Sequence, residues 1–164
     1  MLMTDSYNDN YETCKETSAA FRIMHPALDP DALSRHLGLT PSWAWSKGTP
    51  RGRRRIPARS GIWGFDTDGM LTSRDLRRHL DWLLDHLEPH AMALAALRAE
   101  GYRMDVFCLW CREGGTGGPM LSPRNMARLA ALDLTIGFEF WAVDEDEDED
   151  KAEHNERASD SSSA

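Results

Sequence analysis

Apolar residues recur along this chain with two different spacings, and each spacing predicts one type of secondary structure. Apolar and polar positions alternate over residues 20–24, which is the period of a strand with one buried face. Short apolar runs at 60–65, 106–111 and 136–143 predict three further strands. The pattern therefore predicts a sheet of about four strands.

A stripe of leucines at helical spacing is the strongest periodic signal in the chain. Its members are Leu76, Leu80, Leu83, Leu84 and Leu87. We expect this helix to start at Thr72 or Ser73, because Asp75 follows Thr72 at the spacing of a capping box. Pro89 lacks a backbone N–H and should kink or restart the helix, which then ends at Gly101.

Two shorter helices are predicted by their start signals. Asp29 precedes Pro30 and Ser122 precedes Pro123, and such pairs suit the first turn of a helix. The first of these helices should end at Gly38. The residues expected to face inward from the second are Met126, Leu129 and Leu132. Helices and strands together predict a single α+β domain, with a mainly antiparallel sheet and the three helices packed on one side.

The segments around these two helix starts resemble each other. Residues 28–35 match residues 121–128 at a Leu, a Pro and an Arg. Two interpretations remain open. The chain could contain a duplicated strand–helix–strand unit, which would give the domain a pseudo-twofold arrangement. Alternatively, two unrelated helices share a common start signal.

Charge divides the chain into three parts. Residues 1–18 carry a net charge of −3, residues 19–143 carry +3 and residues 144–164 carry −8. Polar residues without periodicity predict a disordered N-terminal arm at 1–18. Every residue from Asp144 to Asp150 is acidic, and repulsion between these charges predicts a disordered acidic tail at 144–164. The folded domain is therefore expected to span about 19–143.

Composition also limits the compartment. The three cysteines lack the density and the spacing of a disulfide framework. No apolar run approaches the about 20 residues that span a bilayer. The N-terminus lacks the basic and apolar regions of a secretory signal. We therefore expect a cytoplasmic protein that does not contact a membrane.

The segment from Trp43 to Trp63 concentrates aromatic and basic side chains, which supply much of the energy of binding surfaces. The candidate binding residues in it are Trp43, Trp45, Lys47, Arg51, Arg53, Arg54, Arg55, Arg59 and Trp63. Three interpretations remain open. The tryptophans could be core anchors beside a solvated arginine loop. The segment could bind a protein with an acidic surface, or hold single-stranded nucleic acid by phosphate contacts and stacking.

A glycine-rich loop at Gly114–Gly118 is a second candidate site. It lies between a predicted strand and a predicted helix, where backbone amides can hold an anion. Gly117 and Gly118, with Arg112 or Lys47 nearby, would suit a small hydrolase or a nucleotide- or anion-binding enzyme. The loop lacks the residues of a P-loop, so a flexible connector is the other interpretation. No catalytic residues can be assigned.

The cysteines and histidines indicate neither a metal site nor a cofactor. Cys108 and Cys111 stand three apart on a predicted strand, so their thiols should point to opposite faces, with Cys108 in the core. His79, His86 and His90 return to one helical face, although a proline interrupts their spacing. We interpret these histidines as part of a solvated face.

The order of these motifs resembles the bacterial domain-of-unknown-function family DUF4279 over residues 19–143. The resemblance rests on a Leu-Asp-Pro helix, Trp-x-x-x-Lys-Gly, Gly-x-Trp, Glu-Gly-Tyr, a glycine-rich loop and a Leu-Ser-Pro helix. The shared positions are Asp29, Pro30, Trp43, Lys47, Gly48, Trp63, Gly117, Gly118, Pro119, Ser122 and Pro123. The resemblance implies no particular activity. The small, cytosolic character of the family is similar to that of immunity or accessory proteins.

The sequence favours a non-enzymatic binding or inhibitory protein whose surface includes Trp45, Lys47 and the arginines at 51–59. Its expected partner is another protein with an acidic surface, and nucleic acid is the less supported alternative. The acidic tail has two interpretations: it keeps the chain soluble, or it folds back and screens these arginines. The oligomeric state does not follow from the sequence.

Overall fold

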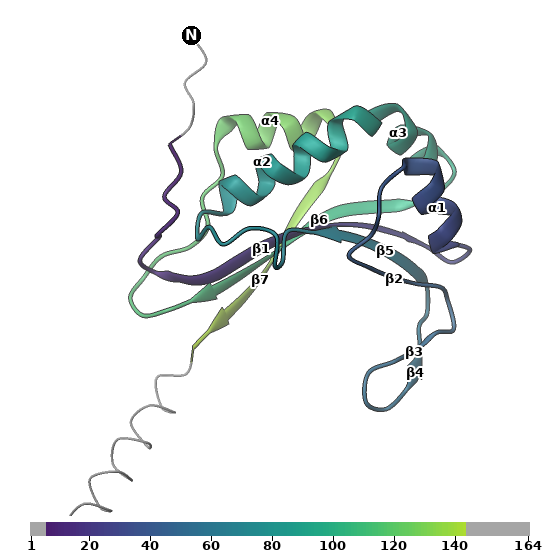
Figure 1. The fold of residues 1–164 in the computed structure, drawn as a ribbon, viewed down its shortest axis with the longest axis horizontal. Helices are drawn as coiled ribbons and strands as arrows, with labels where there is room; N and C mark the ends of the chain where they lie inside the picture. Colours follow the sequence, from purple (N-terminus) through teal and green to yellow (C-terminus); the bar gives the residue numbers. More distant parts are fainter. Residues whose placement is uncertain (1–5, 144–164) are drawn as a thin grey trace, which may run out of the picture.

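A five-stranded sheet with helices on one of its faces forms the body of the protein (Figure 1). This computed structural model describes residues 6–143. The strands lie in the order β2-β5-β1-β6-β7. Their bounds are Cys14–His25 for β1, Trp43–Trp45 for β2, Gly61–Asp66 for β5, Arg103–Arg112 for β6 and Thr135–Ala142 for β7. A separate hairpin of β3 (Pro50–Arg51) and β4 (Ile56–Pro57) projects from the sheet on the side away from the helices (Figure 1).

The sheet is mostly antiparallel, as predicted, but has five strands rather than about four. The central strand β1 pairs antiparallel with β5 on one side and with β6 on the other. Strand β7 pairs parallel with β6. The additional strand, β2, has only three residues, which is too short for its alternation to be recognised in the sequence.

Three helical segments form the second layer, which confirms the prediction for the helices. They are α1 (Pro30–Leu37), a broken segment made of α2 (Leu76–Leu87), η1 (Glu88–His90) and α3 (Ala91–Ala99), and α4 (Pro123–Ala131). The break falls at Pro89, as predicted, because proline cannot continue the backbone hydrogen bonds. Asp29 caps α1, and Gly38 ends it with a positive φ of 65°.

The start of α2 lies at Leu76 rather than at Thr72 or Ser73. The side chain of Asp75 is the N-cap, because it accepts a hydrogen bond from the amide of Arg77. The hydroxyl of Ser73 accepts a bond from the Asp75 amide and belongs to the preceding turn. The helix therefore begins about one turn later than the capping-box spacing predicts.

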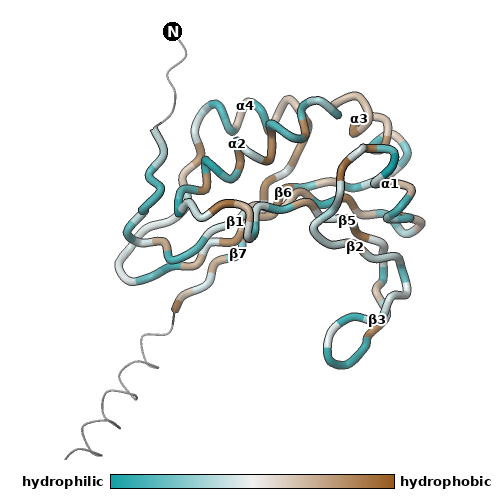
Figure 2. The backbone as a smooth tube through the Cα atoms, in the orientation of Figure 1, coloured by the Kyte–Doolittle hydropathy of each residue, from teal (hydrophilic) through white to brown (hydrophobic). Residues whose placement is uncertain are grey.

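The core lies between the helices and the face of the sheet that they cover. In β1 the alternating residues Ala19, Phe21 and Ile23 are fully buried, and the leucine stripe of α2 packs in the same core. The brown apolar segments of the tube gather between the two layers (Figure 2). The intervening residues of β1, such as Arg22 and Met24, stay partly exposed on the opposite, helix-free face of the sheet.

The inward face of α4 includes Leu129 and Leu132, as predicted, but not Met126. Met126 is 51% exposed, whereas the neighbouring Asn125 is fully buried. Asn125 forms the capping box with Ser122, and its amide also donates to the carboxylate of Asp81 at 3.1 Å. The hydrogen bonds of the cap therefore decide which side of the first turn faces the core.

The predicted solvated histidine face is wrong for His79, which is fully buried. One ring nitrogen of His79 lies 2.7 Å from the Thr67 hydroxyl, and the other lies 2.7 Å from the Ser73 carbonyl oxygen. Burial lowers the pKa of His79 from 6.5. The histidine therefore acts as a neutral link between α2 and the turn that follows β5.

The disordered arm predicted for residues 1–18 extends too far, because β1 already begins at Cys14. Upstream of β1, the Tyr7 hydroxyl donates to Asp81 at 2.7 Å, and the Asn8 amide donates to Asp75 at 2.7 Å. Arg78 and Ser73 both donate to the carboxylate of Asp9. Residues 7–9 are therefore hydrogen-bonded to the first turns of α2 and to the residues just before it.

The acidic tail lies outside the described residues, and the duplicated unit remains a hypothesis. In the second unit β7 lies beside β6, whereas in the first unit β5 separates β2 from β1. No helix within residues 6–143 is long and apolar enough to cross a bilayer.

We expect stability to fall with pH below about 6.5 through His79. Because the folded protein holds the His79 pKa below 6.5, only the unfolded chain takes up the proton in this window. Stability is then full above pH 6.5 and decreases by up to about 1.4 kcal/mol per pH unit below it. Urea unfolding between pH 5 and 7 should show a smaller slope for His79→Gln than for the exposed control His36→Gln. Equal slopes would contradict the prediction.

The Tyr7→Phe substitution should destabilise the fold by about 1 kcal/mol, because it removes a hydrogen bond to a carboxylate. The ring contact of Tyr7 with Arg78 remains in this variant. Chemical denaturation measures the change, with Tyr102→Phe as the matched control. A mobile N-terminal segment would instead leave both variants as stable as the wild type.

Candidate functional site

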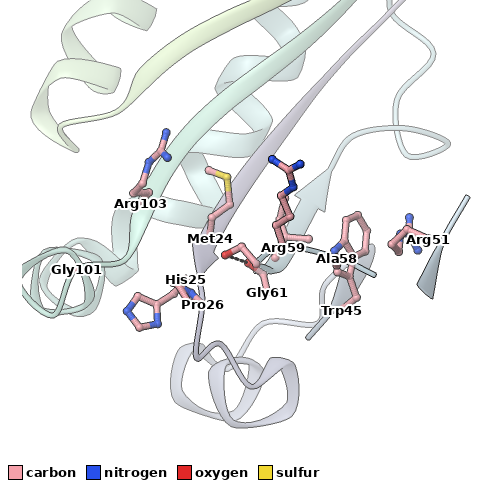
Figure 3. Close-up of a pocket in the computed structure, with 12 residues that line it drawn as sticks. Met24, His25, Pro26, Trp45, Arg51, Ala58, Arg59, Gly61, Gly101 and Arg103 are labelled. Atoms are coloured by element: carbon pink, nitrogen blue, oxygen red, sulfur yellow. Dashed lines mark hydrogen bonds between the residues drawn. The ribbon is translucent and has the colours of Figure 1, made fainter. Parts of the chain in front are cut away.

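A concave pocket lies between the β3–β4 hairpin and the helix-free face of the sheet (Figure 3). Its volume is about 570 Å³. The apolar residues that line it are Met24, Pro26, Trp45, Ala58 and Ile62, and the basic ones are His25, Arg51, Arg59 and Arg103. No carboxylate occurs among the described residues of the lining. The pocket therefore combines an apolar floor with a cationic rim.

The hairpin contributes one wall of this pocket through a contact between Arg51 and Trp45. The guanidinium of Arg51 lies over the indole ring at 3.6 Å from its centroid. Such a stacked cation is attracted to the negative face of the ring and keeps its N–H groups free for an anion. The contact fixes Arg51 relative to β2.

The other two arginines come from distant parts of the chain. Arg59 precedes β5, and Arg103 begins β6, which runs antiparallel to β1 beside Met24. Within residues 6–143 neither side chain has an ion-pair or hydrogen-bond partner. Their charges are therefore available to a ligand.

His25 closes one end of the pocket. Its ring stacks on Tyr102, with centroids 4.3 Å apart and planes 21° from parallel. Its Nδ1 atom accepts a hydrogen bond from the amide of Ala27 at 3.1 Å. The ring is thus held in a fixed orientation by its neighbours.

Trp43 stands beside the pocket rather than in it. Its ring stacks on Trp45 with centroids 5.4 Å apart, and its Nε1 donates to the carboxylate of Asp66 at 2.8 Å. The ring also covers Gly64, where an added Cβ would lie 2.3 Å from ring atoms. Trp43 therefore supports the position of Trp45.

Trp63 lies on the opposite side of the sheet from the pocket. It is fully buried, and its Nε1 donates to the hydroxyl of Ser34 in α1 at 3.0 Å. Of the three tryptophans in the 43–63 segment, only Trp45 lines the pocket. Trp63 is a core anchor, in agreement with the interpretation that assigned the tryptophans to packing.

The remaining basic residues of the segment lie at or near the hairpin. Lys47 is exposed just before β3, and the exposed residues Arg53, Arg54 and Arg55 form the turn between β3 and β4. Arg55 has a positive φ of 50°, which is unusual for a residue other than glycine. These arginines are farther along the hairpin than Arg51 and do not line the pocket.

The glycine-rich loop lies at the other end of the sheet. It follows Arg112 at the end of β6, whereas the pocket contains Arg103 at the start of this strand. An added Cβ at Gly117 would lie 2.2 Å from the hydroxyl oxygen of Thr13, and Arg112 donates to the Gly115 carbonyl at 2.9 Å. The structure therefore does not bring Gly117 or Gly118 together with the tryptophans, and Lys47 is also remote from this loop.

Burial makes two of the cysteine thiols unreactive. Burial raises the pKa of Cys108 to about 12 and that of Cys14 to about 11. Both thiols therefore stay protonated at neutral pH, whereas only the deprotonated thiolate is a good nucleophile or metal ligand. Cys108 lies in the core, as predicted, and Cys111 is partly exposed.

One comparison with known proteins places the chain in a family. A family model described as a domain of unknown function (DUF4279) matches residues 13–143. The chain belongs to the DUF4279 family. The match begins close to the start of β1, which lies upstream of the boundary predicted at residue 19. No curated protein and no solved structure matches the chain.

Sequence reasoning missed several residues that shape the site of this DUF4279 domain. Met24, Ile62 and Arg103 lie far apart in the sequence and meet only because β1 pairs with both β5 and β6. The alternation in β1 indicated that Met24 faces away from the core. Nothing in the sequence indicated that Arg103 would join the arginines of the hairpin.

The Gly64→Ala substitution should displace Trp43 and lower the free energy of unfolding by about 2 kcal/mol. The new methyl group would overlap the Trp43 ring, and such overpacking forces neighbouring groups to shift. Urea unfolding and near-ultraviolet circular dichroism measure the two effects. Gly118→Ala is the control, because no atom lies within 4 Å of its added Cβ. Native-like spectra and stability for both variants would rule out the tight Trp43–Gly64 contact.

Proposed function

We propose that this DUF4279 protein is a non-enzymatic binding protein that recognises an acidic segment of another protein through the arginine pocket. The pocket itself carries this proposal. It joins an apolar floor of Met24 and Ile62 to a rim of Arg51, Arg59 and Arg103. An apolar or aromatic side chain flanked by carboxylates matches both features.

The charge distribution around the pocket supports an anionic partner. The rim arginines have no counter-charge among the described lining residues, so a ligand carboxylate would meet three cations in a partly enclosed site. Charges that are partly shielded from water interact more strongly than charges on an open surface. Acidic segments should therefore bind with a marked dependence on salt.

The chemistry of the lining favours binding over catalysis. His25 is the imidazole of the lining, and its Nδ1 accepts a hydrogen bond from the backbone amide of Ala27. The Ser60 hydroxyl donates to the neighbouring Gly61 carbonyl at 3.3 Å. Covalent catalysis requires a nucleophile within hydrogen-bond reach of a base. Ser60 and His25 do not form such a pair among the interactions of the described residues. An inhibitory or accessory role accords with such a site.

Two alternatives have less support. A hydrolase or anion-binding enzyme at the glycine-rich loop would need free amides at the start of α4, but Ser122 already accepts from the Asn125 amide. A nucleic-acid module would use the exposed arginines of the hairpin turn, where stacking surfaces are absent among residues 52–55. The stacking aromatic of the segment, Trp45, is covered on one side by Arg51.

The Arg59→Glu substitution should weaken binding of an acidic peptide about tenfold, which corresponds to about 1.4 kcal/mol. The probe is a fluorescein-labelled peptide of alternating glutamates with one central phenylalanine, titrated by fluorescence anisotropy at low and physiological salt. Charge reversal replaces attraction by repulsion at the rim of the pocket. The matched control is Arg35→Glu, an exposed arginine on α1 outside the pocket.

Three outcomes decide the proposal. Loss of affinity in Arg59→Glu but not in Arg35→Glu supports it. Equal losses of affinity in both variants would show that the effect comes from net charge alone, which would contradict binding at a defined site. An oligothymidine that binds more tightly than the peptide at equal ionic strength would favour the nucleic-acid alternative instead.

A further inference from the structure

Within residues 6–143, strand β7 leaves a long edge of the sheet unpaired. It pairs with β6 on one side and is the last strand in the sheet order. Its eight residues contain a single charge, Glu139. Phe140 is 62% exposed and Trp141 is 59% exposed, and as neighbours in a strand they point to opposite faces of the sheet. Unpaired backbone groups and exposed aromatic residues make such an edge a template for another strand.

We propose that a second copy of this chain occupies this edge, with the two β7 strands antiparallel. A two-fold axis perpendicular to the sheet relates the copies, so both helical layers lie on the same side of a continuous sheet. The acidic run Asp144–Asp150 begins directly after Val143 and decides the orientation. Parallel strands would bring two runs of seven carboxylates side by side. Antiparallel strands separate their starting points by more than the length of β7, which is about 26 Å and exceeds the Debye length of about 8 Å at physiological salt.

The register of the two strands follows from the same symmetry. The axis keeps each side chain on its own face, so it must pass beside one residue of β7. A centre at Glu139 would place the two Glu139 carboxylates directly opposite each other, which is unfavourable. A centre at Phe138 instead places Ile136 opposite Phe140 and Thr135 opposite Trp141. Of these two registers, the one centred on Phe138 is therefore favoured.

Charge complementarity identifies a second copy as the occupant. Within one chain, β7 ends beside Arg112, and Arg103 of the pocket lies nine positions away along β6, a distance of about 30 Å. The seven-residue run reaches at most about 24 Å from Val143. The run 144–150 by itself therefore falls short of the pocket of its own chain.

In the antiparallel dimer the same run starts at the opposite end of the strand. It would begin beyond Thr135 of the other copy, which is paired with Asp105, two residues from Arg103. Arg98 lies at this end as well, since it donates to the carbonyl oxygen of Leu132 at 2.8 Å. From this point Arg59 lies about four strand spacings away, or about 19 Å, which the run can span. Each acidic run thus reaches the arginine pocket of the other copy.

Sedimentation equilibrium of the full-length chain tests the proposal. The wild type should form a dimer with a dissociation constant in the micromolar range, and high salt should weaken it. Phe140→Lys should raise this constant at least tenfold, because a lysine on an edge strand opposes pairing with a second strand. Met92→Lys is the matched control: Met92 is 89% exposed on α3, and its replacement should leave the dimer intact. Unfolding curves of both variants show that the fold is retained.

A second full-length variant tests the contact of the acidic run. Replacing the seven carboxylates of 144–150 by their amides should weaken the dimer and remove most of its salt dependence. Arg103→Glu should have the same effect. A monomeric wild type, or a dimer that tolerates Phe140→Lys, overturns the β7 interface. An unchanged salt dependence in the amide variant overturns the contact between run and pocket.

This inference shares the arginine pocket with the proposed function, and the two can fail separately. The glutamate peptide should bind more tightly to the amide variant than to the wild type, because the run of the second copy no longer competes for the pocket. If monomeric Phe140→Lys still binds the peptide while the wild type never dimerises, the proposed function stands and the dimer is wrong. A dimer that binds no peptide in the amide variant gives the reverse result.

Discussion

The helices cover one face of the five-stranded sheet, and this one-sided packing determines where everything else lies. Strand β1 is central, and its residues Phe21 and Ile23 are buried beneath the helices while Met24 stays partly exposed on the other face. Because period-two alternation must leave one set of side chains outside the core, the helix-free face keeps apolar groups near water. The arginine pocket forms where the hairpin partly covers this face.

Aromatic stacking connects the hairpin to the sheet and so sets the shape of the arginine pocket. Trp43 is held by Asp66 and by the close approach of Gly64, Trp43 supports Trp45, and Arg51 stacks on Trp45. Each contact orients the next. A substitution at Gly64 would therefore displace the cationic rim without changing any residue that lines the pocket.

On the other side of the sheet, buried polar groups hold the helical layer together. Asp81 of α2 accepts hydrogen bonds from Tyr7, Asn125 and Arg128, which joins the N-terminal segment to α4. Arg128 also pairs with the carboxylates of Asp85 in α2 and Glu88 in η1, and these hydrogen bonds raise the pKa of Arg128. A buried carboxylate is stable only when such partners are present, so the network specifies how the two helices pack.

The sequence by itself determined those features that depend on nearby residues. The leucine stripe, the caps at Asp29 and Ser122 and the break at Pro89 all arise from periodicity or hydrogen bonds within one or two turns. The family resemblance was also evident and is confirmed. The position of Phe140 on an open edge was not, because strand order is a long-range property.

The tertiary structure alone decided which members of the conspicuous tryptophan and arginine segment form a site. Pairing of β5 with β1 buries Trp63 beneath the helices, and the hairpin separates Arg51 and Arg59 from the arginines of its turn. Pairing of β6 with β1 adds Arg103. Side chains from three distant segments can converge only after strands far apart in the sequence have paired, and that pairing is set by packing of the whole sheet rather than by any local pattern.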